Sequence, residues 1–105
     1  MAQFDVLRNP NPATRARVPY LLDVQAELLD SLVTRVVVPL CPAEILKGHL
    51  AERLNPEFEV EGAKFVMLTQ ELAAVPRKVL GEPVGNLSRE RLAIVSALDF
   101  LFTGN

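Results

Sequence analysis

The chain contains 105 residues, half of them hydrophobic, and its 11 basic and 13 acidic side chains give a net charge of −2. A chain of this length is expected to form one domain over residues 1–105, and its weak charge excludes a protein that holds nucleic acid by electrostatic attraction alone. Because a single cysteine excludes an internal disulfide, and no secretion signal or membrane-spanning apolar run is apparent, we expect a cytoplasmic protein.

The first part of the chain is predicted to form strands. Apolar and polar residues alternate over residues 3–7, as in a half-buried strand, and the prolines and asparagines of residues 9–12 end it. A second strand is predicted over residues 20–25. The consecutive valines 36–38 predict a third strand, which we expect to end near Pro39 at a sheet edge, because proline cannot donate a ladder hydrogen bond.

The middle of the chain is predicted to contain a helix, a hairpin and a further strand. Leucine and isoleucine side chains recur on one side of residues 42–54, as in a helix that begins near a proline. Residues 58–68 are predicted to form a hairpin whose turn uses Gly62. A short strand is predicted to extend from residues 75–76 to residues 79–80, before the glycines and prolines that follow.

The last element is predicted to be a helix that begins at Ser88. Serine is a common N-cap residue, and Leu87 is expected to pack against Leu92 across the first turn. A small sheet is not expected to cover this helix alone, so the pattern predicts a homodimer and a partner site at the apolar helix end. Apolar residues occupy a broad face and much of a second face: Ile94, Val95, Leu98, Leu101 and Phe102, then Ala93, Ala97 and Phe100.

The predicted fold carries no recognisable catalytic motif. Many short strands followed by one helix predict a mainly β protein, a small barrel or strongly bent sheet with a C-terminal α-helix. His49 is interpreted as a surface or packing residue and Cys41 as a small buried hydrophobic residue. Asp23, Glu27 and Asp30 form a cluster that is more often solvated than catalytic. The sequence predicts no enzyme, no cofactor and no metal site.

Collinear motifs cover nearly the whole chain. They begin with residues 22–30, LDVQAELLD, and continue through Arg35, Val38, Pro39, Leu40, Met67, Thr69, Ala73, Val75, Pro76, Val79, Leu80, Gly81, Glu82, Val84, Leu87, Ser88, Phe102 and Gly104. Together these positions resemble the CcdB toxins of bacterial toxin–antitoxin modules. Agreement over this length is more specific than any single short motif.

The resemblance implies both a fold and a function. The fold is a homodimeric, SH3-like β-barrel with a C-terminal helix, which CcdB toxins share with MazF/Kid toxins. The function is that of a toxin that binds the A subunit of DNA gyrase and traps the gyrase–DNA cleavage complex, without chemistry of its own. A CcdA-like antitoxin is expected to neutralise it. The complex is expected to repress its own operon, as in plasmid maintenance, with the antitoxin supplying the contact with operator DNA.

The resemblance also implies the residues that contact gyrase, namely Leu28, Leu29, Asp99, Phe102, Thr103, Gly104 and Asn105. Leu101 is expected at the dimer interface, near the twofold axis. The best-known CcdB pattern has asparagine at Asp99, tryptophan at Thr103 and isoleucine at Asn105. Losing an aromatic anchor typically costs roughly 2 kcal/mol, about a thirtyfold weakening, so either other contacts replace it or gyrase is bound weakly.

Two alternatives remain open from the sequence. The barrel also suits a MazF/Kid-like endoribonuclease, in which Arg15 and Arg17 with His49 or Asp23 would supply the acid, base and phosphate-stabilising groups. The third reading is a non-toxic relic that binds an antitoxin but no longer kills.

Overall fold

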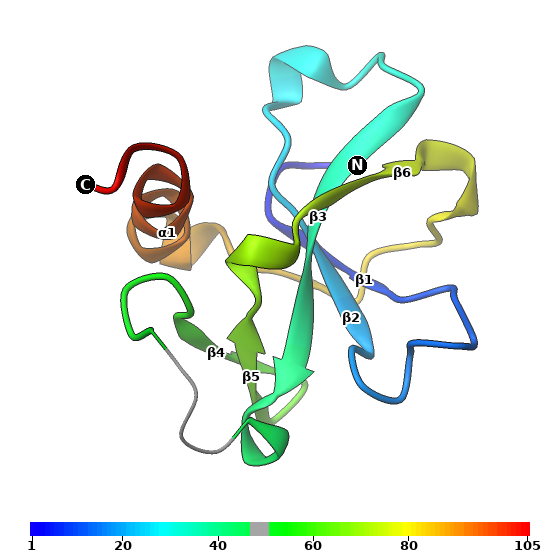
Figure 1. Ribbon diagram of the computed structural model, residues 1–105. Coiled ribbons are helices and arrows are strands. Elements are labelled where there is room, and N and C mark those ends of the chain that lie inside the picture. The colour runs from blue at the N-terminus through cyan, green and yellow to red at the C-terminus, as the bar shows by residue number, and fades with distance from the viewer. Residues whose placement is uncertain (47–50) are drawn as a thin grey trace.

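The computed structural model describes residues 1–46 and 51–105 as a strongly bent antiparallel sheet that nearly closes into a barrel, with one helix beside it (Figure 1). The strands run in the order β4-β5-β3-β2-β1-β7, and β6 pairs with β3. The mainly β class with a C-terminal helix, predicted from the sequence, is confirmed. The elements are β1 (Asp5–Arg8), β2 (Tyr20–Asp23), β3 (Thr34–Pro42), β4 (Glu57–Val60), β5 (Ala63–Met67), β6 (Ala73–Pro76), β7 (Gly85–Asn86) and α1 (Arg91–Thr103), with 3-10 turns η1 (Glu27–Leu29), η2 (Ala43–Ile45), η3 (Thr69–Glu71), η4 (Arg77–Val79) and η5 (Ser88–Glu90).

The central strand β3 continues through Pro39, so the prediction that this proline ends the strand at a sheet edge is wrong. Residues 34–37 of β3 pair with β6, and residues 40–42 pair with β5. Pro39 lies where β3 changes from one partner to the other, and its carbonyl accepts a hydrogen bond from the Leu68 N–H at 2.9 Å. A residue without an N–H is tolerated there because neither neighbouring strand requires that donor.

The predicted hairpin is confirmed as β4 and β5, with Phe58 opposite Phe65 and Val60 opposite Ala63. Its turn consists of Glu61 and Gly62, whose φ angles are 50° and 83°. Two consecutive positive φ angles characterise a type I′ turn, whose twist matches that of paired strands. Glycine adopts this conformation without steric cost, which explains the sequence signal.

Replacing Gly62 with alanine is expected to lower the free energy of unfolding by about 1 kcal/mol, because the left-handed conformation is unfavourable for a residue with a Cβ. An added Cβ would meet no heavy atom within 4 Å at Gly62 or at Gly81, and of the two only Gly62 has a positive φ. Gly81→Ala is therefore the control and is expected to leave stability unchanged or slightly raised. Urea unfolding of both variants measures the difference, and equal stabilities would contradict this account of the turn.

The main hydrophobic core lies between the sheet and α1. Ile94 and Ala97 of the helix are fully buried against it. The sheet side contributes Phe4, Val6, Tyr20, Leu22, Val38, Leu40, Phe58, Val60, Phe65 and Met67. A smaller cluster contains Cys41 and Val66, with Val18 and Leu68. Among the described residues, no helix is both long and apolar enough to cross a bilayer.

Two elements of the middle region differ from the prediction. Pro42 belongs to β3, and beyond it only the short turn η2 is helical within the described residues up to 46. Ile45 is 54% exposed whereas Leu46 packs against the smaller cluster, so these two residues do not share one buried helix face as the prediction over residues 42–54 required. Residues 47–50 lie outside the described part of the chain. The strand predicted to extend from residues 75–76 to residues 79–80 is confirmed only at residues 75–76, because β6 ends at Pro76 and the turn η4 follows.

The predicted C-terminal helix is confirmed, but it begins differently. The side-chain oxygen of Asn86 accepts a hydrogen bond from the Ser88 N–H at 2.8 Å, which starts the turn η5. Ser88 makes no side-chain cap, and Arg91 is the first residue of α1. Leu92 is 86% exposed, so the predicted packing of Leu87 against Leu92 is wrong. Leu87 packs against the main core instead.

Candidate functional site

The end of α1 is held in a defined conformation by its own backbone and one hydroxyl. Gly104 adopts φ 75°, and its N–H donates to the Phe100 carbonyl at 3.0 Å. The Thr103 hydroxyl donates to the Asp99 carbonyl at 2.7 Å and accepts a weaker hydrogen bond from the Asn105 N–H at 3.3 Å. The left-handed glycine satisfies a helix carbonyl that would otherwise lack a partner. Gly104 thus has a structural role in addition to the contact that the sequence predicts.

The side chains at this helix end face solvent. Phe102 is 68% exposed, and Asp99, Thr103 and Asn105 are exposed as well. Leu101, predicted at the dimer interface, is half-buried in the single chain. Exposing a large aromatic side chain contributes nothing to the packing of this chain, so Phe102 does not complete the core. An exposed aromatic side chain of this kind is a candidate contact for another protein.

The other predicted contact segment is the loop of residues 26–33. It begins with the turn η1, in which Leu28 is 96% exposed and Leu29 is 49% exposed. Leu32 and Val33 are also 47% and 83% exposed, and the sequence alone did not single them out. Their position close to Leu28 and Leu29 in the sequence could have indicated that they belong to the same exposed surface. We call Leu28, Leu29, Leu32 and Val33 the loop surface.

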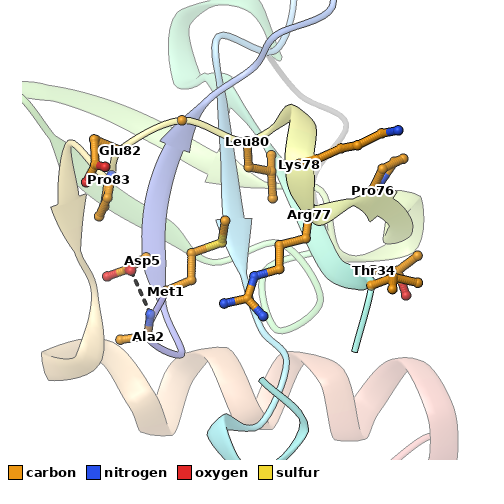
Figure 2. Close-up of a pocket in the computed structure, with 12 residues that line it drawn as sticks. Met1, Ala2, Asp5, Thr34, Pro76, Arg77, Lys78, Leu80, Glu82 and Pro83 are labelled. Carbon is orange, nitrogen blue, oxygen red and sulfur yellow. Dashed lines mark hydrogen bonds between the residues drawn. The ribbon is translucent and has the colours of Figure 1, made fainter. Parts of the chain in front are cut away.

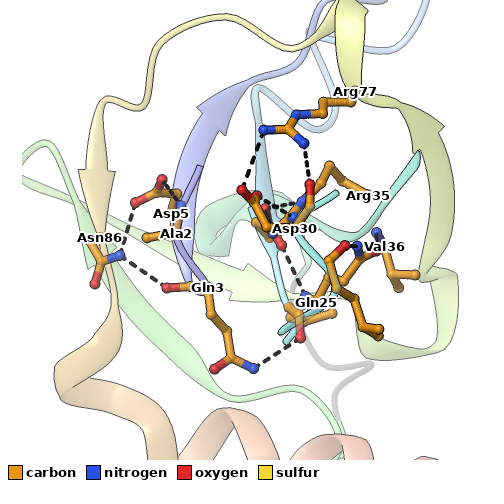
Figure 3. A network of polar contacts seen from close by, with 12 residues as sticks. Ala2, Gln3, Asp5, Gln25, Asp30, Arg35, Val36, Arg77 and Asn86 are labelled. Atoms are coloured by element: carbon orange, nitrogen blue, oxygen red, sulfur yellow. Dashed lines mark hydrogen bonds and ion pairs between the residues drawn. The ribbon is translucent and has the colours of Figure 1, made fainter. Parts of the chain in front are cut away.

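A buried ion pair lies behind this loop (Figure 3). The side chains of Arg35 on β3 and Asp23 on β2 are completely buried. Nε of Arg35 donates to Oδ2 of Asp23 at 2.8 Å, and Nη2 lies 2.7 Å from the same oxygen without the alignment of a hydrogen bond. Nη1 of Arg35 donates to Oδ1 of Asp30 at 2.9 Å. A buried pair of this kind fixes geometry because an unpaired charge there would be costly.

Further polar contacts connect the pair to the loop backbone. The Gln25 amide donates to the Leu29 carbonyl at 2.9 Å and accepts from the Val36 N–H at 3.0 Å. Nη1 of Arg77 donates to the Asp30 carbonyl, and its Nη2 lies 3.5 Å from Asp30 Oδ2. Reasoning from the sequence missed the structural roles of these side chains. One signal was available: Arg35 directly precedes the run of valines in a strand predicted to be buried. A buried arginine needs an acidic partner nearby.

Asp23 is unsuited to acid–base catalysis because it contacts no solvent. Burial raises the pKa of its carboxyl, while the hydrogen bonds from the Gln25 N–H and from Arg35 act in the opposite direction. Of the residues considered for a ribonuclease, Arg17 forms an exposed ion pair with Glu71 at 3.1 Å. His49 lies outside the described residues. Among the residues described, the structure does not assemble Asp23 and Arg17 into one site.

The helix end and the loop surface stand apart within one chain. Figure 1 shows α1 beside the sheet, whereas the loop after β2 extends from another part of it. Among the described residues, no hydrogen bond or ion pair joins residues 99–105 to residues 26–33. The chain therefore presents two separate exposed apolar surfaces rather than a single cleft.

A pocket with a volume of about 1280 Å³ lies beside the loop (Figure 2). It is lined by Met1, Asp5, Val33, Arg77 and Glu82, among other residues. Asp5 is already engaged, because its carboxylate accepts hydrogen bonds from the Ala2 N–H at 2.8 Å and from the Asn86 amide at 2.9 Å. None of the predicted contact residues lines this pocket, and Val33 alone links it to the loop surface.

In the part of the chain that the structure describes, the other candidate reactive groups do not form a cluster. Within residues 1–46 and 51–105, no cluster of histidine, cysteine and carboxylate side chains could hold a metal ion. Cys41 is buried, as predicted, and burial raises the pKa of its thiol, which disfavours the reactive thiolate. The exposed apolar side chains are therefore the most distinctive features of the described surface.

The chain matches a known protein family. A family model described as CcdB protein matches residues 3–104 of the 105-residue chain. The match includes the loop of residues 26–33, the buried ion pair behind it and the end of α1 through Gly104. It therefore covers every element of the candidate surfaces except the last residue.

Proposed function

Since the chain belongs to the CcdB family of toxins from toxin–antitoxin systems, we propose that it binds the A subunit of DNA gyrase and traps the complex of gyrase with cleaved DNA. The observation that carries this proposal is the exposure of Phe102, 68%, at the capped end of α1. An exposed aromatic side chain on a rigid helix provides apolar contact area with little loss of conformational freedom.

The proposed mechanism consists of binding alone. Phe102, Leu28 and Leu29 would supply apolar contacts to gyrase, and the exposed carboxylate of Asp99 would supply a polar one. The Thr103 hydroxyl is occupied by the Asp99 carbonyl, so it supports the conformation of the chain end rather than a reaction. Toxicity should then depend on the binding surface and not on any bond-making step, and we propose that the protein is not an enzyme.

We also propose a CcdA-like antitoxin as the neutralising partner. In this scheme the antitoxin supplies the DNA-binding part of a complex that represses the operon. The net charge of −2 supports this division of labour, since a protein that grips operator DNA by itself needs a basic surface. All three partners, gyrase, antitoxin and operator DNA, would be met in the cytoplasm.

A homodimer is the proposed assembly. Only Ile94 and Ala97 of α1 are fully buried in the single chain, so the sheet of the same chain leaves much of the apolar helix face uncovered. Half-buried Leu101 lies between the covered and the open sides of the helix. A second copy packed on this region would remove apolar surface from water without requiring a different protein.

Replacing Leu101 with aspartate is expected to weaken dimerisation at least tenfold, because it would place an unpaired charge in an apolar interface, at a cost of roughly 2 kcal/mol or more. Sedimentation velocity over a dilution series measures the dimer dissociation constant. Leu92→Asp is the control on the same helix, since Leu92 is 86% exposed. An unchanged dimer mass for the Leu101 variant at low concentration would refute its placement at the interface.

A cleavage-complex assay tests the proposed function directly. The purified protein is incubated with gyrase from its own host, ATP and supercoiled plasmid, and detergent and protease then release any trapped break. Linear DNA is the expected product. Its absence with folded protein would contradict gyrase poisoning, and RNA cleavage by the same preparation would favour the ribonuclease alternative over an inactive relic.

A further inference from the structure

The backbone behind the loop surface is held at several carbonyl oxygens. The Leu29 carbonyl accepts from the Gln25 amide at 2.9 Å, and the Asp30 carbonyl accepts from Nη1 of Arg77. The Val33 carbonyl accepts from the backbone N–H of Arg77 at 2.9 Å. Arg77 thus contacts the loop with both its backbone and its side chain. It connects Asp30 and Val33, in the second half of the loop, to the segment that follows β6.

The contact joins segments that are distant in sequence. Arg77 begins η4, directly after β6, and Asp30 precedes it by 47 residues. Asp30 lies between the two arginines: Nη1 of Arg35 contacts its Oδ1 at 2.9 Å, and Nη2 of Arg77 lies 3.5 Å from its Oδ2. Arg35 is completely buried, whereas the Arg77 and Asp30 side chains are 39% and 42% exposed. Arg77 and Asp30 are therefore both accessible from solvent, and Figure 3 shows how they lie relative to Arg35.

The loop backbone is fixed by hydrogen bonds, whereas the apolar side chains of the loop surface are exposed to solvent. Leu28 and Val33, at 96% and 83% exposed, make little contact with their own chain. A loop whose apolar side chains do not pack internally has no core of its own to order it, so its conformation depends on these polar contacts. Ordering a binding loop before the partner arrives reduces the entropy lost on association.

We propose that Arg77 is a positioning residue, which orders residues 26–33 so that the loop surface meets an apolar face of the protein partner in one conformation. This inference rests on the proposed function, in which Leu28 and Leu29 contact gyrase. It extends the proposed contact to Leu32 and Val33. It also assigns the ordering of the loop surface to Arg77, which is not part of that surface. Arg77 itself does not touch the partner.

Hydrogen exchange of the full-length protein tests the ordering role without any partner. The informative amides are those of Asp30 and Leu32, which donate to the Glu27 and Leu29 carbonyls at 3.0 and 3.1 Å. In Arg77→Gln these amides are expected to exchange about tenfold faster, because hydrogen bonds from a charged donor are the stronger class. Amides of paired residues in β2 and β3 should keep their wild-type rates. Unchanged loop exchange, or equal acceleration throughout the sheet, would overturn the proposal.

The matched control is Lys78→Gln, which removes the same charge from the next residue, an exposed side chain of the same turn. It should leave exchange in the loop unchanged. Arg77→Lys should restore part of the protection, because an ammonium group can donate to the Asp30 carbonyl but cannot also reach its carboxylate in a fork. Acceleration by Lys78→Gln equal to that of Arg77→Gln would show a general charge effect and contradict a specific role of Arg77.

Binding to a fragment of the gyrase A protein completes the test. Arg77→Gln should weaken binding about tenfold, and Lys78→Gln should leave the dissociation constant unchanged. A loosened loop with wild-type affinity would overturn the positioning role. No binding by the wild-type protein would instead contradict the proposed function, and the exchange experiment would still decide whether Arg77 orders the loop. The two failures are therefore distinguishable.

Discussion

Replacing Phe102 with alanine, or deleting residues 103–105, is expected to abolish gyrase trapping while the protein stays folded. Phe102 is 68% exposed, so its truncation leaves no cavity in the core. As an aromatic anchor in an interface it should contribute roughly 2 kcal/mol or more, and its loss should weaken gyrase binding at least about thirtyfold. The deletion leaves the buried residues Ile94 and Ala97 in place, although it removes the glycine that ends α1. The cleavage-complex assay measures both variants.

Leu92→Ala is the matched control for Phe102→Ala. Leu92 lies on the same helix and is 86% exposed, so the substitution also removes an exposed apolar side chain, but near the start of α1. It should leave the yield of linear DNA unchanged. Circular dichroism and urea unfolding establish that each variant is folded. Full trapping by a folded Phe102 variant, or by the shortened protein, would show that the chain end is not the gyrase site.

Replacing Arg35 with methionine is expected to lower the free energy of unfolding by about 3–5 kcal/mol, because removing one partner leaves the other charge buried and unpaired. The affected partner is Asp23, whose side chain is completely buried and lies 2.7 Å from Arg35. Small domains have total stabilities of about 5–15 kcal/mol, so this loss is a large part of the whole. Urea unfolding followed by circular dichroism measures it.

Arg17→Met provides the comparison for an exposed ion pair. Arg17 and Glu71 form a pair at 3.1 Å, and their side chains are 54% and 39% exposed. Such pairs contribute about 0–1 kcal/mol, so this variant should remain close to the wild type. If Arg35→Met were as stable as Arg17→Met, the buried pair would not stabilise the fold, and the anchoring of the loop behind Leu28 and Leu29 would need another explanation.

The elements that were predicted correctly are those specified by local sequence. The turn at Glu61 and Gly62 requires positive φ angles, and glycine reveals that requirement directly. The broad apolar face of α1 likewise marks a helix whatever it packs against. Phe102 and its neighbours could be proposed as a partner site because an apolar helix end is visible in the sequence, and the exposure of the side chain agrees with that reading.

The errors arose where distant segments decide the structure. Pro39 was expected to end a strand, yet the chain continues because β3 changes its partner there, from β6 to β5. The short strand was predicted to run from residues 75–76 to residues 79–80, which is too far along the chain, since only pairing with residues 34–37 of β3 limits it to Ala73–Pro76. Arg77 is a similar case, because nothing within its own segment indicates that its partner is Asp30, 47 residues earlier.

The pairing of β1 with β7 also has a kinetic consequence. Asp5 and Asn86 are opposite each other in the sheet and are 81 residues apart in sequence. Closing a loop of this length opposes folding entropically, and domains rich in such non-local pairs fold in milliseconds to seconds rather than microseconds. Asn86 also starts the turn that leads into α1. The helix that carries Phe102 is thereby coupled to one of the longest-range contacts of the fold, so we expect Phe102 to reach its final position only late in folding.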